Sequence, residues 1–129
     1  MSEQTTPPDF QPSLRTMAMP ANANANGDIF GGWLMSQMDI AGGTYAYYIA
    51  KGRVVTVAVN AMTFHLPVYI GDEISCYCAT DRIGNTSIAV KIDTWVRRRS
   101  DGASEKVTEG LFTFVAIDKN GQPRPVIDD

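Results

Sequence analysis

The pattern of hydrophobic positions changes along the chain from a helical spacing to an alternating one. Residues 31–51 contain no proline, and apolar side chains recur there four or seven residues apart, at Leu34, Met38, Tyr45 and Ile49. Such a spacing places these side chains on one face of an α-helix. The sequence therefore predicts one long helix at residues 31–51.

Alternating apolar and polar residues fill most of the remaining chain, which is typical of β-strands with one buried face. Turn-forming pairs, such as Asp101-Gly102 and Asn120-Gly121, separate these segments. The predicted strands cover residues 14–19, 53–64, 73–82, 86–99 and 105–118. One short strand, one helix and four strands joined by tight turns favour an α+β fold, in which an antiparallel sheet holds a single helix.

Length and charge narrow the class of protein. The 129 residues suit one domain, which we expect over residues 13–127, after a polar, proline-bearing tail at residues 1–12 that we expect to be disordered. This tail lacks the apolar core of a secretory signal, and no apolar segment has the length of a membrane span. The net charge of −3 gives no overall attraction to nucleic acid or to an anionic membrane. An anionic ligand therefore needs a local positive cluster.

Cysteine and histidine are too few and too scattered to predict a metal site. Cys76 and Cys78 are the only cysteines, and their spacing on one strand suits neither a disulfide nor zinc. Two free thiols favour a reducing compartment, so we expect a cytoplasmic protein. We expect neither a metal nor another cofactor.

Asp39 is the first residue that points to chemistry. On a helix that advances about 100° per residue, Asp39 lies at the edge of the apolar face, beside Gly42 and Gly43. Two glycines inside a helix cost on the order of 1 kcal/mol each relative to alanine. A carboxylate beside such a gap indicates space for a ligand or a water. The alternative is a solvated Asp39 next to glycines that only permit close packing on the sheet.

Gly31 and Gly32 open the same helix and expose backbone N–H groups at its positively polarised end. Such donors suit a carbonyl oxygen that gains negative charge during acyl transfer. Gly31 and Asp39 are eight residues apart, or about 12 Å along a straight helix. One substrate can contact both only if the first turn is bent or if a second subunit completes the site. Asp28, just before the helix, is expected to cap it.

A specific resemblance is carried by several segments of the sequence. The longest is NANGDIFGGWLMSQMD at residues 24–39, and the others are GRVVTVAV at residues 52–59, FHLPV at residues 64–68, Gly71-Asp72 and FTFVA at residues 112–116. In these segments the chain resembles the hotdog-fold acyl-CoA thioesterases, in particular the bacterial YciA-type branch, which is related to the cytosolic acyl-CoA hydrolases. The resemblance extends over about residues 14–126.

This resemblance implies a hotdog fold, in which an antiparallel sheet wraps around one long central helix. It also implies hydrolysis of short- to medium-chain acyl-CoA thioesters to free coenzyme A and a carboxylic acid. Asp39 matches the family's general base or nucleophile. Gly31 matches the glycine whose amide polarises the thioester carbonyl, with Gly32 as its neighbour, and Asn24 matches a polar position that contacts substrate or water. Phe30 replaces a histidine of some members, so no role of that ring is expected here.

The resemblance further implies self-association, because family members assemble their active sites across a dimer. We therefore expect at least a dimer, and a hexamer built as a trimer of dimers. The expected small-molecule partners are the acyl-CoA substrate and the coenzyme A product.

The phosphates of coenzyme A need positive or hydrogen-bonding groups. Arg82 precedes a Gly84-Asn85 turn, and Thr86 and Ser87 follow it with hydroxyls and backbone donors, so we expect phosphate contacts there. Arg97 begins the strongest basic run of the chain, Arg-Arg-Arg, and is a further candidate. Neighbouring residues of a strand alternate in direction, so the three arginines cannot all contact one ligand. Solvated strand ends are the alternative interpretation of each of these residues.

Two other functions remain open at this point. A non-catalytic hotdog domain would bind acyl-CoA without any need for Asp39. A hotdog dehydratase or hydratase would pair an acid with a histidine, and His65, the single histidine, lies outside the helix segment.

Overall fold

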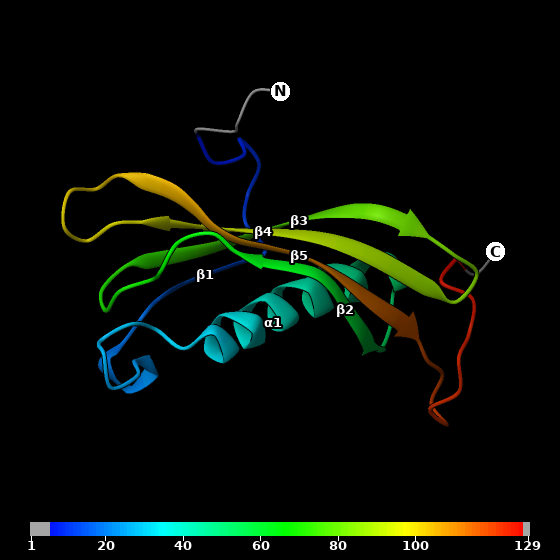
Figure 1. The fold of residues 1–129 in the computed structure, drawn as a ribbon. Helices are drawn as coiled ribbons and strands as arrows, with labels where there is room; N and C mark the ends of the chain where they lie inside the picture. The colour runs from blue at the N-terminus through cyan, green and yellow to red at the C-terminus, as the bar shows by residue number, and fades with distance from the viewer. Residues whose placement is uncertain (1–5, 128–129) are drawn as a thin grey trace.

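The structure, a computed structural model, describes residues 6–127. One five-stranded antiparallel sheet has the strand order β1-β3-β4-β5-β2. A short 3₁₀ turn (η1) and one long helix (α1) follow the first strand. The elements are β1 (Leu14–Met17), η1 (Pro20–Asn22), α1 (Gly31–Ala50), β2 (Val54–Phe64), β3 (Glu73–Ile83), β4 (Ser87–Arg97) and β5 (Ser104–Ala116). The sheet curves over α1 (Figure 1). This confirms the predicted α+β hotdog fold.

The helix lies close to the sheet because its middle turns carry small residues. A Cβ atom at Gly42 would lie 2.7 Å from Ile92 Cδ1 and 2.9 Å from Phe114 Cζ, which is too close for any residue with a side chain unless these neighbours shift. Gly42 is therefore a packing glycine. Gly43 is different, because its Cβ would meet Phe114 at an ordinary 3.7 Å.

The hydrophobic stripe predicted for the helix faces the core in the N-terminal half of the helix. In the C-terminal half it faces only the edge of the core. Leu34 and Met38 are buried, whereas Tyr45 and Ile49 are only partly buried against the core cluster. Toward the C-terminal end of the helix, the buried residues are the smaller Ala46 and Ala50. Within residues 6–127 no helix combines the length and the apolar character needed to cross a membrane.

The segment before β1 lies on the face of the sheet opposite α1, here called the outer face (Figure 1). The Phe10 ring meets the Tyr77 ring edge-on at 5.8 Å between centroids. The Ser13 N–H donates to the Cys76 carbonyl oxygen at 2.8 Å. Disorder of the tail at residues 1–12 stays a prediction, and residues 1–5 lie outside the described part of the chain.

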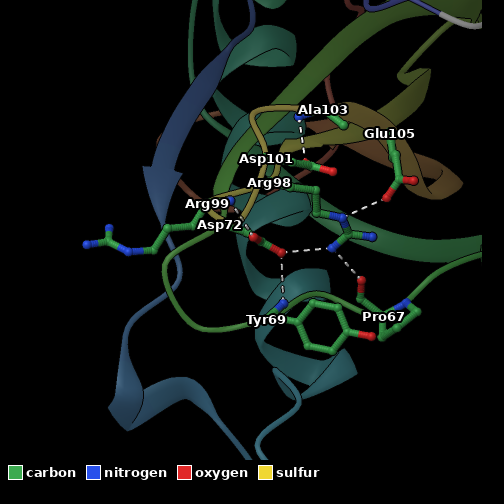
Figure 2. A network of polar contacts seen from close by, with 8 residues as sticks. All are labelled: Pro67, Tyr69, Asp72, Arg98, Arg99, Asp101, Ala103 and Glu105. Atoms are coloured by element: carbon green, nitrogen blue, oxygen red, sulfur yellow. Dashed lines mark hydrogen bonds and ion pairs between the residues drawn. The ribbon is translucent and has the colours of Figure 1, made fainter.

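A buried ion pair ties the loop before β3 to the end of β4 (Figure 2). The Arg98 guanidinium donates to Asp72 Oδ2 at 2.8 Å, and their side chains are 9% and 3% exposed. The Asp72 carboxylate also accepts the Tyr69 N–H at 2.9 Å and the Arg99 N–H at 3.1 Å. Each Asp72 oxygen therefore has a donor, as a buried carboxylate requires.

Arg98 is equally well satisfied. Its Nε donates to Glu105 at 2.7 Å, and its Nη1 also donates to the Pro67 carbonyl oxygen at 2.9 Å. Burial lowers the pKa of Arg98, but the hydrogen bonds and charges of Asp72 and Glu105 outweigh this effect and raise the pKa above its usual value. Arg98 thus serves the fold and is not free to bind a ligand.

Substitution Asp72→Asn should destabilise the protein by about 3 kcal/mol, the scale for removing one partner of a buried ion pair. Denaturant unfolding monitored by circular dichroism measures this loss. The control is Asp101→Asn in the turn after β4, where an exposed side chain only accepts the Ala103 N–H, and its expected effect is below about 0.5 kcal/mol. Equal stabilities of the two variants would show that the ion pair is dispensable.

Both cysteines are free and buried within the sheet. Burial raises the pKa of the Cys76 thiol to about 12, although the hydrogen bond with Thr94 opposes the shift. Burial raises the pKa of Cys78 to about 11. The reactive thiolate is therefore scarce at neutral pH.

We expect the folded protein to resist alkylation by iodoacetamide at pH 8, because both thiols are inaccessible and protonated. Mass spectrometry should find two modified cysteines only after unfolding in guanidinium chloride. Stoichiometric labelling of the folded protein within minutes would contradict the burial of Cys76 and Cys78.

Candidate functional site

Asp39 borders a cavity of about 480 Å³ between α1 and the start of β2. Its Oδ1 accepts a hydrogen bond of 2.6 Å from the Thr56 hydroxyl. This bond orients the carboxylate, since Thr56 is fixed by its pairing with Phe114 in the sheet. The cavity walls are Asp39, Ile40, Gly43, Thr44, Tyr47 and Tyr48 from the helix and Arg53, Val54, Thr56 and Phe114 from the sheet.

The walls of this cavity are mostly apolar and exposed. Tyr47 and Tyr48 project from the helix with 50% and 74% of their surface exposed, and Ile40 is 54% exposed. The helix aromatics could be expected to serve mainly in packing, but Tyr47 and Tyr48 do not pack into the core of the protomer. Large apolar side chains left open around a carboxylate are typical of a surface that a ligand or a second protein covers.

The start of α1 presents unpaired backbone donors. Phe30 is the N-cap and makes no side-chain capping bond. Within residues 6–127, no oxygen accepts a hydrogen bond from the Gly31 or Gly32 N–H. The predicted cap by Asp28 is wrong, because its carboxylate does not reach the helix; its backbone instead forms a bridge to Tyr69. Both amides are thus available to an anionic or carbonyl oxygen.

The ring of Phe64 covers one side of this donor pair. A Cβ atom at Gly31 would lie 3.3 Å from Phe64 Cε1, whereas Gly32 has open space around it. A side chain at position 31 would contact the Phe64 ring closely and would restrict the access of a ligand to the Gly31 amide. The absence of side chains at both positions keeps this approach open.

Asn24 lies in the loop that leads to the helix and has a structural task there. Its Oδ1 accepts the Asn26 N–H at 2.9 Å and the Asp28 N–H at 3.2 Å, which closes a tight turn. The backbone of Asn24 adds a 2.7 Å bond to the Asp28 carbonyl oxygen. No described residue pairs with Nδ2, so this amide group remains free to donate to a ligand.

One protomer does not bring these groups together. Gly31 and Asp39 lie on the same straight helix, about 12 Å apart along its axis. The residues that line the Asp39 cavity do not include Asn24, Gly31 or Gly32. The carboxylate and the amide donors therefore form two half-sites at separate places on α1.

The residues predicted to bind phosphate lie at opposite ends of the sheet. Arg82 is exposed near the end of β3, with Thr86 and Ser87 at the neighbouring turn into β4. Arg97 ends β4 ten residues after Ser87, or about 33 Å away at the rise of a strand. It donates to Glu73 at 3.2 Å. Arg97 and Arg82 of one protomer cannot contact the same phosphate group.

His65 lies outside both half-sites. It follows β2 and its Nε2 is 2.9 Å from Glu109 Oε1, with the histidine side chain 39% exposed. Glu109 in turn binds Lys106, and this hydrogen bond is the main reason why the pKa of Glu109 is lowered. The histidine thus belongs to a polar network of the sheet and not to the Asp39 cavity.

Sequence reasoning missed Thr56 and Arg53 as neighbours of Asp39. Thr56 is the single polar residue within the apolar run Val54–Val59, a weak signal of a special role. Pairing between the helix and this strand is a tertiary contact, and no local pattern predicts which turn of the helix faces which residue of β2.

Comparisons with known proteins agree with this fold. A family model described as the thioesterase superfamily matches residues 26–103. The acyl-CoA thioester hydrolase YciA of Escherichia coli is 54% identical over 114 residues, which cover 86% of either chain. An uncharacterized acyl-CoA thioester hydrolase of Buchnera aphidicola is 55% identical over 117 residues, with 88% of this chain and 87% of the relative covered.

Among solved structures, the hexameric thioesterase y2039 of Yersinia pestis superposes with a TM-score of 0.88 at 51% identity. The alignment covers 95% of this chain and 99% of that one. The chain therefore belongs to the thioesterase superfamily, and its relatives include YciA-type acyl-CoA thioester hydrolases. This confirms the family predicted from the sequence.

Proposed function

We propose that this protein hydrolyses acyl-coenzyme A thioesters, with Asp39 as the catalytic carboxylate. The observation that carries the proposal is the Asp39 side chain at the wall of a cavity of about 480 Å³, held there by Thr56. Membership of the thioesterase superfamily and the similarity to YciA-type hydrolases support the reaction.

In this reaction water adds to the thioester carbonyl, the carbon–sulfur bond breaks, and the products are free coenzyme A and a carboxylate. Asp39 either removes a proton from the attacking water or attacks the carbonyl itself and forms an anhydride that water then opens. The carbonyl oxygen becomes negative in the tetrahedral intermediate. The amides of Gly31 and Gly32 stabilise this charge, because they point outward from the positive end of α1.

The two half-sites require a second copy of the chain. β2 is an edge strand of the sheet, and its Val57 and Val59 are 55% and 37% exposed. Exposed apolar edges of this length invite pairing with another strand. We propose a dimer paired through β2, in which Asp39 of one copy faces the Gly31 amide of the other. Three such dimers would then form a hexamer, and the similar thioesterase y2039 of Yersinia pestis is hexameric.

The cavity supports short- to medium-chain substrates. Its volume of about 480 Å³ lies within the usual range for small-molecule sites, and Ile40, Tyr47 and Phe114 offer apolar contacts to an acyl chain. Asn24 Nδ2 would donate to the substrate or to water near the start of α1. Arg82, Thr86 and Ser87 would contact the phosphates of coenzyme A. Arg97 lies too far from them to share one binding site within a protomer.

Two other functions are weaker for specific reasons. A dehydratase or hydratase needs a histidine beside the acid, but His65 binds Glu109 and does not line the Asp39 cavity. A non-catalytic acyl-CoA-binding domain would not need the Asp39 carboxylate or the Thr56 hydroxyl that orients it. We further propose a cytoplasmic location, which the two free, buried cysteines support.

Substitution Asp39→Asn should lower kcat for butyryl-CoA by at least about 100-fold, the usual scale for a general base. A thiol reagent that detects released coenzyme A measures the rate. The asparagine retains the size of the side chain, so circular dichroism and thermal melting should be unchanged. Full activity of Asp39→Asn would refute the proposal.

Substitution Thr56→Val should lower kcat by about tenfold, because it removes the hydrogen bond that orients the carboxylate and preserves the shape of the side chain. Thr56→Ser keeps the hydroxyl and should retain most of the activity. If the serine and valine variants lose activity equally, packing rather than the hydrogen bond is responsible.

Substitution Val57→Lys should dissociate the dimer, because it places a charge within the proposed β2 pairing. Analytical ultracentrifugation should detect monomers that lack thioesterase activity although Asp39 is intact. The control Ile83→Lys makes the same change at an exposed residue of β3. An active monomer of Val57→Lys would show that one chain contains a complete site.

A further inference from the structure

The second half of β2 contains a β-bulge in which two residues, Ala61 and Met62, lie opposite the single residue Gly110 of β5. Ala61 has a φ of +52°, in the left-handed region that a residue with a side chain seldom adopts. The Met62 side chain covers Gly110, where its Cε would lie 3.1 Å from a Cβ atom. Bulges and left-handed residues of this kind are over-represented next to active sites, where they re-aim a side chain.

The bulge changes the face of the sheet on which Phe64 lies. Residues paired across two strands share a face, so Val59 lies with its buried partner Phe112 on the inner face, which α1 covers. Strict alternation from Val59 would place residue 64 on the outer face. The extra residue of the bulge reverses this order, and Phe64 lies on the inner face, paired with the buried Thr108.

From the inner face the ring of Phe64 reaches the start of α1. Its Cε1 and Cζ would lie 3.3 and 3.4 Å from a Cβ atom at Gly31, so the ring packs against the Gly31 backbone. The loop after β2 is tied to the same place, because the Ile29 N–H donates to the Val68 carbonyl oxygen at 2.9 Å. The ring and the Gly31 amide therefore keep a fixed relative position, although Phe64 is 48% exposed.

The proposed β2 pairing would also bring this ring to the other half-site. When two identical strands pair in antiparallel fashion about a two-fold axis, the end of one strand lies beside the start of the other. Phe64, the last residue of β2, would then lie near Val54 of the other copy. Val54 lines the Asp39 cavity. Phe64 would thus lie between the Gly31 amide of its own copy and the Asp39 cavity of the other.

We propose that Phe64 is a positioning residue of the hydrolysis and acts through the Gly31 amide, an inference that rests on the proposed function. The ring keeps water from one side of this N–H and leaves the thioester oxygen a single direction of approach. A hydrogen bond from which water is partly excluded stabilises the negative tetrahedral intermediate more strongly than one in bulk water. Because this charge develops only in the reaction, loss of the ring affects kcat more than KM.

Substitution Phe64→Ala should lower kcat for butyryl-CoA about tenfold, less than the loss of 100-fold or more that follows removal of a whole oxyanion donor. KM should change by less than about twofold, because the ground state carries no such charge. Phe64→Leu, which keeps a smaller apolar group, should have an intermediate kcat. A thiol reagent that detects released coenzyme A gives both constants. Circular dichroism and analytical ultracentrifugation should show an unchanged fold and oligomer.

The matched control is Leu66→Ala, which truncates another exposed apolar residue of the same segment that does not contact the Gly31 position. Its kcat and KM should equal those of the wild type. The inference is overturned if Phe64→Ala keeps the kcat of the wild type, if its KM rises instead, or if it loses activity only through dissociation of the oligomer. Equal losses of kcat in Phe64→Ala and Leu66→Ala would also overturn it.

A double-mutant cycle locates the effect at Gly31. Gly31→Ala alone should lower kcat, because its Cβ would press on the Phe64 ring. In the Phe64→Ala background this Cβ has room, so the loss of kcat caused by Gly31→Ala should be roughly threefold smaller. In the Leu66→Ala background the loss should be the same as in the wild type. If Gly31→Ala lowers kcat equally in all three backgrounds, the ring does not act through the Gly31 amide.

The same assays separate the failure of this inference from the failure of the proposed function. If the wild type releases no coenzyme A from butyryl-CoA, the proposed function and the inference both fail. If the wild type is active and Asp39→Asn is not, while Phe64→Ala equals the wild type, the proposed function is supported and the role of Phe64 alone is overturned.

Discussion

The close approach of α1 to the curved sheet is the constraint on which the rest of the structure depends. At Gly42 the helix backbone comes so near to Ile92 and Phe114 that a Cβ atom would meet them at less than 3 Å. The helix is held at this distance and rotation by the buried Leu34 and Met38. Its opposite side then has to face outward, so the apolar side chains of Ile40, Tyr47 and Tyr48 are left exposed there.

This fixed rotation also decides where the proposed catalytic residue lies. Asp39 comes to the flank of the helix beside β2, where the Thr56 hydroxyl reaches its carboxylate at 2.6 Å. The Gly31 amide lies on the same rigid helix and cannot approach the same carbonyl group. About 12 Å of helix therefore separates the proposed donor from the proposed acid, and for this reason we propose that a second subunit completes the site. The exposed edge of β2 provides the surface at which two copies can join.

Local patterns determined the elements of this protein. Hydrophobic spacing and turn residues predicted the helix and all five strands, with the ends of each element correct to within two residues. These signals depend on residues that are neighbours in the sequence: the side chains that share one face of an element, and the residues that allow a left-handed turn. The sequence segment at residues 24–39 also determined the family and singled out Asp39.

The tertiary structure alone decided how these elements meet. Thr56 became the partner of Asp39, and Arg98 became a buried residue instead of part of a basic surface, because each contact joins segments distant in the sequence. Phe64 came to pack against Gly31 for the same reason. The spacing of residues along one chain carries no information about such contacts, which depend on how the sheet curves over the helix.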